Sequence, residues 1–168
     1  MNSEINAFIN KYVKEIRNNN AAFFAGAGFS KESGYVDWKT LLESIALELN
    51  LELEKEHDLV ALAQYYYNKH QNRGMINDVI FEEFSKQKEP TQNHKILARL
   101  PISVIWTTNY DDLIEKAFGN VQKIVDVKSR NEHLSNTLAN RECILYKMHG
   151  DKNNPNDAIL ILAQSIPW

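Results

Sequence analysis

The sequence predicts an α/β fold, namely a parallel sheet with a helical module inserted at one edge. Short apolar runs, typical of strands buried on both faces, alternate with helix-like periodicity along the chain. One long stretch, residues 38–100, shows helical patterns alone. The 168 residues fit one domain, and 43% hydrophobic with 24% charged residues is ordinary for a globular protein.

The N-terminal third is predicted to hold a helix followed by a buried strand. Apolar residues at helical spacing predict an amphipathic helix over residues 3–18, ended by Asn18–Asn20. The continuous apolar run 21–25 predicts a strand. Asp37 then precedes a second helical pattern that begins at Trp38.

The rest of the chain continues the alternation. Further helices are predicted over residues 58–70, 75–87, 91–100, 111–118 and 131–139, and further strands over 103–106, 123–127 and 143–148.

Composition argues against several classes of protein. A net charge of −3 argues against a nucleic-acid binder, and no stretch has the roughly 18 apolar residues of a membrane span. The N-terminus is charged throughout and unlike a signal peptide, so we expect a cytoplasmic protein. Cys143 is the only cysteine, which excludes an internal disulfide and a multi-cysteine zinc module.

A glycine-containing loop follows the first predicted strand. It consists of Gly26, Ala27, Gly28, Phe29 and Ser30. Glycines let a backbone approach a pyrophosphate closely, and the N–H groups of a following helix favour anions. The loop departs from the G-x-G-x-x-G fingerprint because Lys31 occupies the third glycine position. A nucleotide-binding loop and an ordinary tight turn both remain possible here.

Polar residues follow two other predicted strands. Asn109 and Asp111 come after residues 103–106, and His149 comes after 143–148. Ligands of open α/β sheets bind at the carboxyl ends of strands, so these side chains are expected at one rim with Gly26. Asn109 could hold a ribose hydroxyl or a water, and His149 could act as a general base. Alternatively, Asp111 caps the next helix and His149 is a turn residue. The other histidines are expected at the surface: His57, His70, His94 and His133.

Three stretches together resemble the sirtuin family. Residues 26–34 resemble the sirtuin GAG-x-S-x-x-S-G loop, and residues 108–111 resemble the Q-N-x-D segment with Thr108 in place of glutamine. His149-Gly150 resembles the sirtuin His-Gly pair. The stretches NAAFFAGAGFS, DLVALAQYYYN, NHKILARLP, WTTNYDDLIEKA and YKMHGD are similar to bacterial sirtuin-like anti-phage NADases of the Thoeris type. The resemblance covers about residues 5–161.

The resemblance implies a Rossmann-like domain that cleaves NAD to nicotinamide and ADP-ribose or a cyclic form, depleting NAD during anti-phage defence. It implies Asn109 and His149 as catalytic residues, Asp111 as a contact to the nicotinamide carboxamide, and the glycine loop as the cofactor-binding segment. It also implies NAD as substrate, a homo-oligomer such as a tetramer, and no metal, nucleic-acid or membrane partner.

Two departures from the family shape this expectation. The zinc module of sirtuin deacylases is absent, because there is one cysteine. The family domain also continues with a second glycine loop and, in the Thoeris type, a sensor domain for a signal nucleotide. Residues 162–168 form an atypical tail, so residues 1–168 are expected to be a C-terminally truncated sirtuin-like domain. The alternatives are an NAD-dependent deacylase or ADP-ribosyltransferase, and a truncated nucleotide-binding or oligomerisation module without catalysis.

The chemistry needs few groups. Nicotinamide is positively charged while attached to ribose and leaves as a neutral molecule, so the paired carboxylates of glycoside hydrolysis are not required. The site must hold the phosphates, orient the ribose and accept a proton, roles that suit the glycine loop, Asn109 and His149 respectively. His149 must be neutral to act as a base, so activity is expected to fall below its pKa, ordinarily about 6.5.

Overall fold

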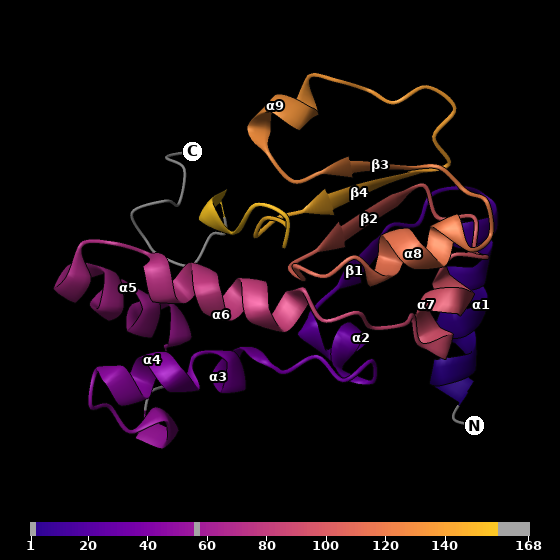
Figure 1. The fold of residues 1–168 in the computed structure, drawn as a ribbon. Helices are drawn as coiled ribbons and strands as arrows, with labels where there is room; N and C mark the ends of the chain where they lie inside the picture. The colour runs from indigo at the N-terminus through magenta and orange to yellow at the C-terminus, as the bar shows by residue number, and fades with distance from the viewer. Residues whose placement is uncertain (1–2, 56–57, 158–168) are drawn as a thin grey trace.

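The computed structural model describes residues 3–55 and 58–157, which form a parallel four-stranded sheet with helices packed against one of its faces (Figure 1). The strands are β1 (Phe23–Ala25), β2 (Val104–Thr107), β3 (Val125–Lys128) and β4 (Cys143–Lys147), in the order β1-β2-β4-β3. In register, Ala25 pairs with Thr107 and Thr107 with Lys147. Three strands therefore end at the same edge, as predicted.

The helices also follow the predicted order. They are α1 (Ser3–Arg17), α2 (Ala27–Lys31), α3 (Trp38–Leu41), α4 (Glu43–Glu48), the 3₁₀ turn η1 (Leu53–Lys55), α5 (Leu59–His70), α6 (Gly74–Phe84), α7 (Gln92–Leu97), α8 (Leu113–Gly119), α9 (Asn131–Leu134) and the 3₁₀ turn η2 (Pro155–Asp157). The helix predicted from Trp38 is divided in two at Leu42. The helix predicted over 131–139 is one short turn.

Side-chain caps explain where several helices begin. The Asp37 carboxylate accepts from the Thr40 amide at 3.0 Å, and Asp58 accepts from the amides of Val60 and Ala61. Thr91 caps α7 by accepting from the His94 amide. Each cap satisfies backbone N–H groups that have no partner within the first helical turn.

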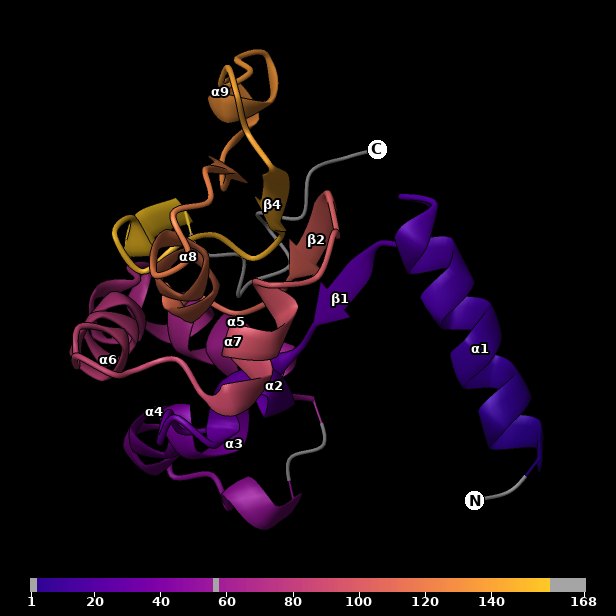
Figure 2. The same cartoon turned by 90° about the vertical axis from the view of Figure 1, so that its right-hand side faces the viewer.

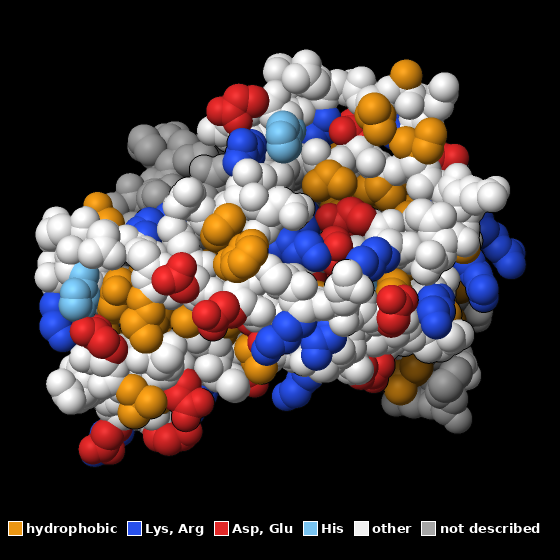
Figure 3. All heavy atoms as spheres, in the orientation of Figure 1, with side chains coloured by type: hydrophobic (Ala, Val, Ile, Leu, Met, Phe, Trp, Pro, Cys, Tyr) orange, Lys and Arg blue, Asp and Glu red, His pale blue; other side chains and the backbone are white. Residues whose placement is uncertain are grey.

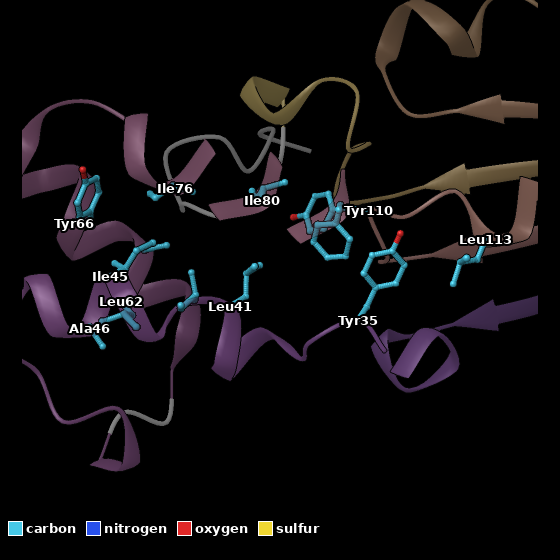
Figure 4. Packing of buried hydrophobic residues seen from close by; sticks show 13 residues of the cluster. Tyr35, Leu41, Ile45, Ala46, Leu62, Tyr66, Ile76, Ile80, Tyr110 and Leu113 are labelled. Atoms are coloured by element: carbon cyan, nitrogen blue, oxygen red, sulfur yellow. The ribbon is translucent and has the colours of Figure 1, made fainter. Parts of the chain in front are cut away.

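Two hydrophobic clusters lie side by side. One gathers helices α3–α6 around Leu42, Ile45 and Leu62, and the other packs Ile105 and Leu145 of the sheet against α7 and α8. Tyr110, from the segment between β2 and α8, reaches into the helical cluster, and Figure 4 shows it between the helices and the strands. The inserted helical module is therefore joined to the sheet by the segment that follows β2.

The opposite face of the sheet carries a row of aromatic side chains. Phe24 pairs in register with Trp106, and Trp106 with Tyr146. The last two rings stack at 4.2 Å, and Phe24 is 62% exposed. Helix α1 stands apart from the body, to which β1 connects it (Figure 2), and Ile16 is its only buried residue within Ser3–Arg17.

The surface is mixed in character. Figure 3 shows acidic and basic side chains interspersed with small hydrophobic groups on the face in view. Within residues 3–55 and 58–157, no helix is both long and apolar enough to cross a membrane.

Candidate active site

The glycine loop begins a short helix at the carboxyl end of β1. Gly26 is the residue before α2, with an extended backbone (φ −99°, ψ −178°) and a carbonyl that accepts from the Phe29 amide at 2.9 Å. The Phe29 ring points into the protein, where it packs against Phe23 and His94 with ring centroids 5.2 and 4.4 Å apart. The Phe29 side chain thus anchors the loop to the core.

The fold itself does not require glycine at either position of this loop. Gly26 and Gly28 have no positive φ, and an added Cβ at either would meet no atom within 4 Å among the described residues. Glycine inside a helix costs about 1 kcal/mol relative to alanine. Close approach by a ligand is a physical reason for glycines that neither conformation nor crowding demands.

Asn109 joins this loop to the end of β2. Its Nδ2 donates to the Gly26 carbonyl at 3.0 Å and to Ser30 Oγ at 2.9 Å. Its backbone amide donates to Thr107 Oγ1 at 3.0 Å, and that hydroxyl donates to the Ala25 carbonyl. The amide hydrogens of Asn109 are therefore used within the chain, which leaves its oxygen to accept from a ribose hydroxyl or a water.

A pocket of about 330 Å³, partly open to solvent, lies between the glycine loop and the helical module. Four of the predicted site residues line it, namely Ala27, Ser30, Asn109 and Asp111. The remaining lining residues are Tyr35, Val36, Trp38, Leu41, Phe84, Thr108 and Tyr110.

Asp111 lies one residue before the N-cap of α8, which is Asp112, and its two carboxylate oxygens have different surroundings. Its Oδ1 accepts from the Leu113 amide at 3.0 Å, which holds the first turn of α8. Its Oδ2 is buried and has no hydrogen-bond partner among the described residues. A buried carboxylate oxygen without a partner is costly, so Oδ2 is available to a donor that enters the pocket.

His149 lies two residues beyond β4, at the same sheet edge as Asn109, which lies two residues beyond β2. It is not among the residues that line the pocket. Its Nδ1 is buried without a partner in the described structure, and burial holds the pKa of His149 below its ordinary value. Gly150, at φ 103°, makes the turn that follows. His149 is thus a neutral imidazole near pH 7 with an unused ring nitrogen.

The expectation that the other histidines are at the surface is wrong for His94. His94 is fully buried, because α7 packs against the glycine loop and the imidazole completes the cap made by Thr91. His70 is half-buried and pairs with Glu48 at 2.9 Å. His57 lies outside the described residues.

Two kinds of site residue were not predicted from the sequence. Trp38 and Phe84 reach the pocket from the helical module and Tyr35 from the segment before it, and none of them was singled out as a site residue from the sequence. Lys147 ends a buried strand, yet its ammonium group lies directly behind the pocket, where it binds the Tyr110 and Asp111 carbonyls. Within residues 3–55 and 58–157, no three His, Cys, Asp or Glu side chains group as metal ligands would.

The chain is similar in sequence to several known proteins. Residues 103–165 match the model of the SIR2-like domain. Over 162 residues the chain is 54% identical to NAD(+) hydrolase ThsA of Bacillus cereus strain MSX-D12, an alignment that covers 96% of this chain and 34% of that protein. It is 53% identical to ThsA of Acinetobacter baumannii strain 532279, covering 90% of this chain and 32% of the relative.

A more distant relative is defense-associated sirtuin 2 of Bacillus subtilis. It is 36% identical, over 83% of this chain and 14% of the relative. The chain spans about a third of the length of the ThsA proteins that it matches.

Proposed function

We propose, on the premise that this chain is a relative of the sirtuin-like NAD(+) hydrolases, that residues 1–168 supply the NAD-binding and catalytic part of such an enzyme. The reaction is hydrolysis of NAD to nicotinamide and an ADP-ribose product, and its role is NAD depletion in the cytoplasm during anti-phage defence. The observation that carries the proposal is the pocket in which the glycine loop, Asn109 and Asp111 meet.

The pocket suits the nicotinamide end of NAD. Its walls include the rings of Tyr35, Trp38, Phe84 and Tyr110, which favour a flat cation through their π faces. Asp111 Oδ2, which has no partner in the described chain, can accept a hydrogen bond from the carboxamide NH₂. Both contacts favour the positively charged, NAD-bound form of the ring, and a neutral leaving group then departs without a general acid.

The ribose and phosphates would lie toward the glycine loop. The open space beside Gly26 and Gly28 allows a pyrophosphate to approach the backbone. The oxygen of Asn109 orients a ribose hydroxyl or the attacking water. The neutral imidazole of His149 accepts the proton that the attacking water loses as its oxygen bonds to the ribose and the bond to nicotinamide breaks.

The larger assembly is part of the same proposal. We infer, from the resemblance to the Thoeris type described in the sequence analysis, that the chain works as a homo-oligomer and that a signal nucleotide binds a separate sensor domain.

The test is nicotinamide release from NAD, followed by chromatography, with the complete gene product that carries this chain. His149→Ala should slow release by about 10²–10⁴-fold, the usual cost of losing a positioned base. His133→Ala is the matched control, because His133 lies on α9, its ring contacts Ser129, and it does not line the pocket. It should leave the rate unchanged.

Three results would contradict the proposal. Calorimetric binding of NAD without nicotinamide release would favour a non-catalytic nucleotide-binding module. Release that depends on an added acyl-lysine peptide would favour the deacylase. Equal activity of the His149→Ala variant and the unmodified protein would remove His149 from the mechanism.

A further inference from the structure

Lys147, the last residue of β4, has a completely buried side chain. Its Nζ donates to the carbonyls of Tyr110 at 3.2 Å and Asp111 at 2.7 Å. It also pairs with Glu115 Oε1 at 3.0 Å and Asp151 Oδ2 at 2.5 Å. One ammonium group therefore has two backbone and two carboxylate acceptors.

These four acceptors come from three segments that surround the candidate active site. Tyr110 and Asp111 belong to the loop that carries Asn109, and Glu115 belongs to the first turns of α8. Asp151 follows His149 by two residues. Lys147 thus connects the loop after β2 to the loop after β4 from behind the pocket.

The second loop is itself braced around Asp151. Asp151 Oδ1 accepts from the Asn153 amide at 2.9 Å and from Asn153 Nδ2 at 2.7 Å. The backbone amide of Lys152 donates to the Tyr110 carbonyl at 3.1 Å, the same oxygen that Lys147 contacts. The loop that carries His149 is therefore fixed to the loop that carries Asn109 by both a side chain and a backbone hydrogen bond.

The ammonium group remains charged in this setting. Burial alone lowers the pKa of Lys147, but the Glu115 and Asp151 carboxylates outweigh burial and hold that pKa above its ordinary value. Removing one member of a buried, hydrogen-bonded ion pair leaves the others without compensation. A neutral side chain of similar length would leave two carbonyls and two carboxylates facing each other.

We propose that Lys147 is a positioning residue, which fixes the Asn109–Asp111 loop relative to the His149 loop so that both sets of side chains meet one substrate. The inference rests on the proposed function, since positioning has a catalytic consequence only if these loops act on a shared ligand. Displacement of a catalytic group by about 1 Å, even from a distance, can cost about 100-fold in rate.

The chain offers a matched control in Lys128. It is the last residue of the neighbouring strand β3, its side chain is 6% exposed, and it pairs with Asp126 at 2.8 Å. Its other partner is the Asn136 carbonyl, outside the candidate site. Lys128→Met therefore removes a strand-end ammonium that is also paired and almost completely buried, without touching either loop.

The experiment compares Lys147→Met, Lys128→Met and the unmodified complete gene product in two assays, at a temperature where melting curves show all three folded. In NAD cleavage, Lys147→Met should lower kcat by about 100-fold with a much smaller change in KM, whereas Lys128→Met should keep kcat. In amide hydrogen exchange, the backbone amides of residues 108–113 and 149–153 should exchange faster in Lys147→Met than in the unmodified protein. Their exchange rates should be unchanged in Lys128→Met.

Unchanged kcat and unchanged exchange at residues 108–113 in Lys147→Met would overturn the inference. Equal losses of kcat in both variants would also overturn it, because the effect would then be general destabilisation. If the unmodified protein releases no nicotinamide, the proposed function fails separately, and the exchange pattern still decides whether Lys147 holds the two loops together.

Discussion

The two oxygens of Asp111 have different environments, and substitutions can separate them. Asp111→Asn keeps an oxygen for the Leu113 amide but replaces the unpartnered Oδ2 with an NH₂ group. We expect little change in melting temperature and a higher KM for NAD, because a donor now faces the carboxamide donor. Asp111→Ala should also destabilise the protein by about 1 kcal/mol through loss of the hydrogen bond to the Leu113 amide.

Thermal melts and Michaelis constants, measured on both variants, check this prediction. If Asp111→Asn keeps the original KM, the carboxylate holds the helix alone and the ligand contact is elsewhere.

The pH dependence of activity follows from His149. Burial lowers the pKa of His149, so its neutral form persists below the ordinary value of 6.5. We expect kcat/KM to be flat at neutral pH and to fall through a midpoint below 6.5, as the base becomes protonated. A pH–rate profile of the unmodified protein measures this midpoint; a midpoint above 7 would contradict the assignment of His149 as a buried base.

Stability should change over the same range. Burial lowers the pKa values of both His94 and His149, so below about pH 6.5 the unfolded chain binds protons that the folded chain does not. Their contribution to stability is complete above that pH and is lost as pH falls toward the folded-state pKa values. Denaturant midpoints between pH 7.5 and 5, compared with those of His94→Gln, test the sign; the variant should show the weaker pH dependence.

At the scale of the element, α5 depends on its N-terminal cap. The Asp58 carboxylate accepts from two backbone amides, each at 3.0 Å. Asp58→Ala should lower the free energy of unfolding by about 1 kcal/mol, because those N–H groups lose their acceptor. Asp58→Asn is the control, since asparagine caps helices equally well, and a similar loss in both variants would point to charge rather than capping.

The sequence was most informative where apolar periodicity and strand ends define an element. The run 21–25, the break after it and the position of Asp37 before a helical pattern predicted elements close to those observed. The sequence also predicted Asn109 close to Gly26, because parallel strands in register end at one edge of the sheet. The structure has a hydrogen bond between these two residues. The buried position of Lys147 could not be predicted in this way. A lysine at the end of an apolar strand usually indicates that the chain is leaving the core there.

The burial of His94 and the aromatic residues that line the pocket could not be predicted from the sequence either. Periodicity specifies which face of a helix is apolar, and it does not specify which other segment covers that face. Trp38 and Phe84 belong to different helices, and the ring of each packs against Tyr110, with ring centroids 5.5 and 5.6 Å apart respectively.

At the scale of the whole molecule, Tyr110 joins the sheet to the helical module. Its ring is 1% exposed, and its hydroxyl has no hydrogen-bond partner in the described chain. Tyr110→Ala should cost about 3–5 kcal/mol, the usual effect of deleting a buried aromatic ring. Tyr110→Phe should be neutral or stabilising, because it removes an unsatisfied buried hydroxyl.

Guanidinium unfolding followed by circular dichroism compares these two variants. A stability loss in Tyr110→Phe comparable with that in Tyr110→Ala would mean that the hydroxyl, rather than the ring, is what joins the two modules.

The register of the three site-bearing strands has a consequence for how the protein acquires its site. A hydrogen bond joins Thr107 to Ala25 at the ends of β2 and β1, and these two residues are 82 positions apart in the sequence. Lys147 is 37 positions from Tyr110, whose carbonyl it contacts. Contacts of such long sequence separation form only after large loops have closed, which makes folding of parallel sheets slow. Asn109 and Ser30, which are 79 residues apart, therefore come together only after the loop between them has closed, so the site is expected to form late in folding.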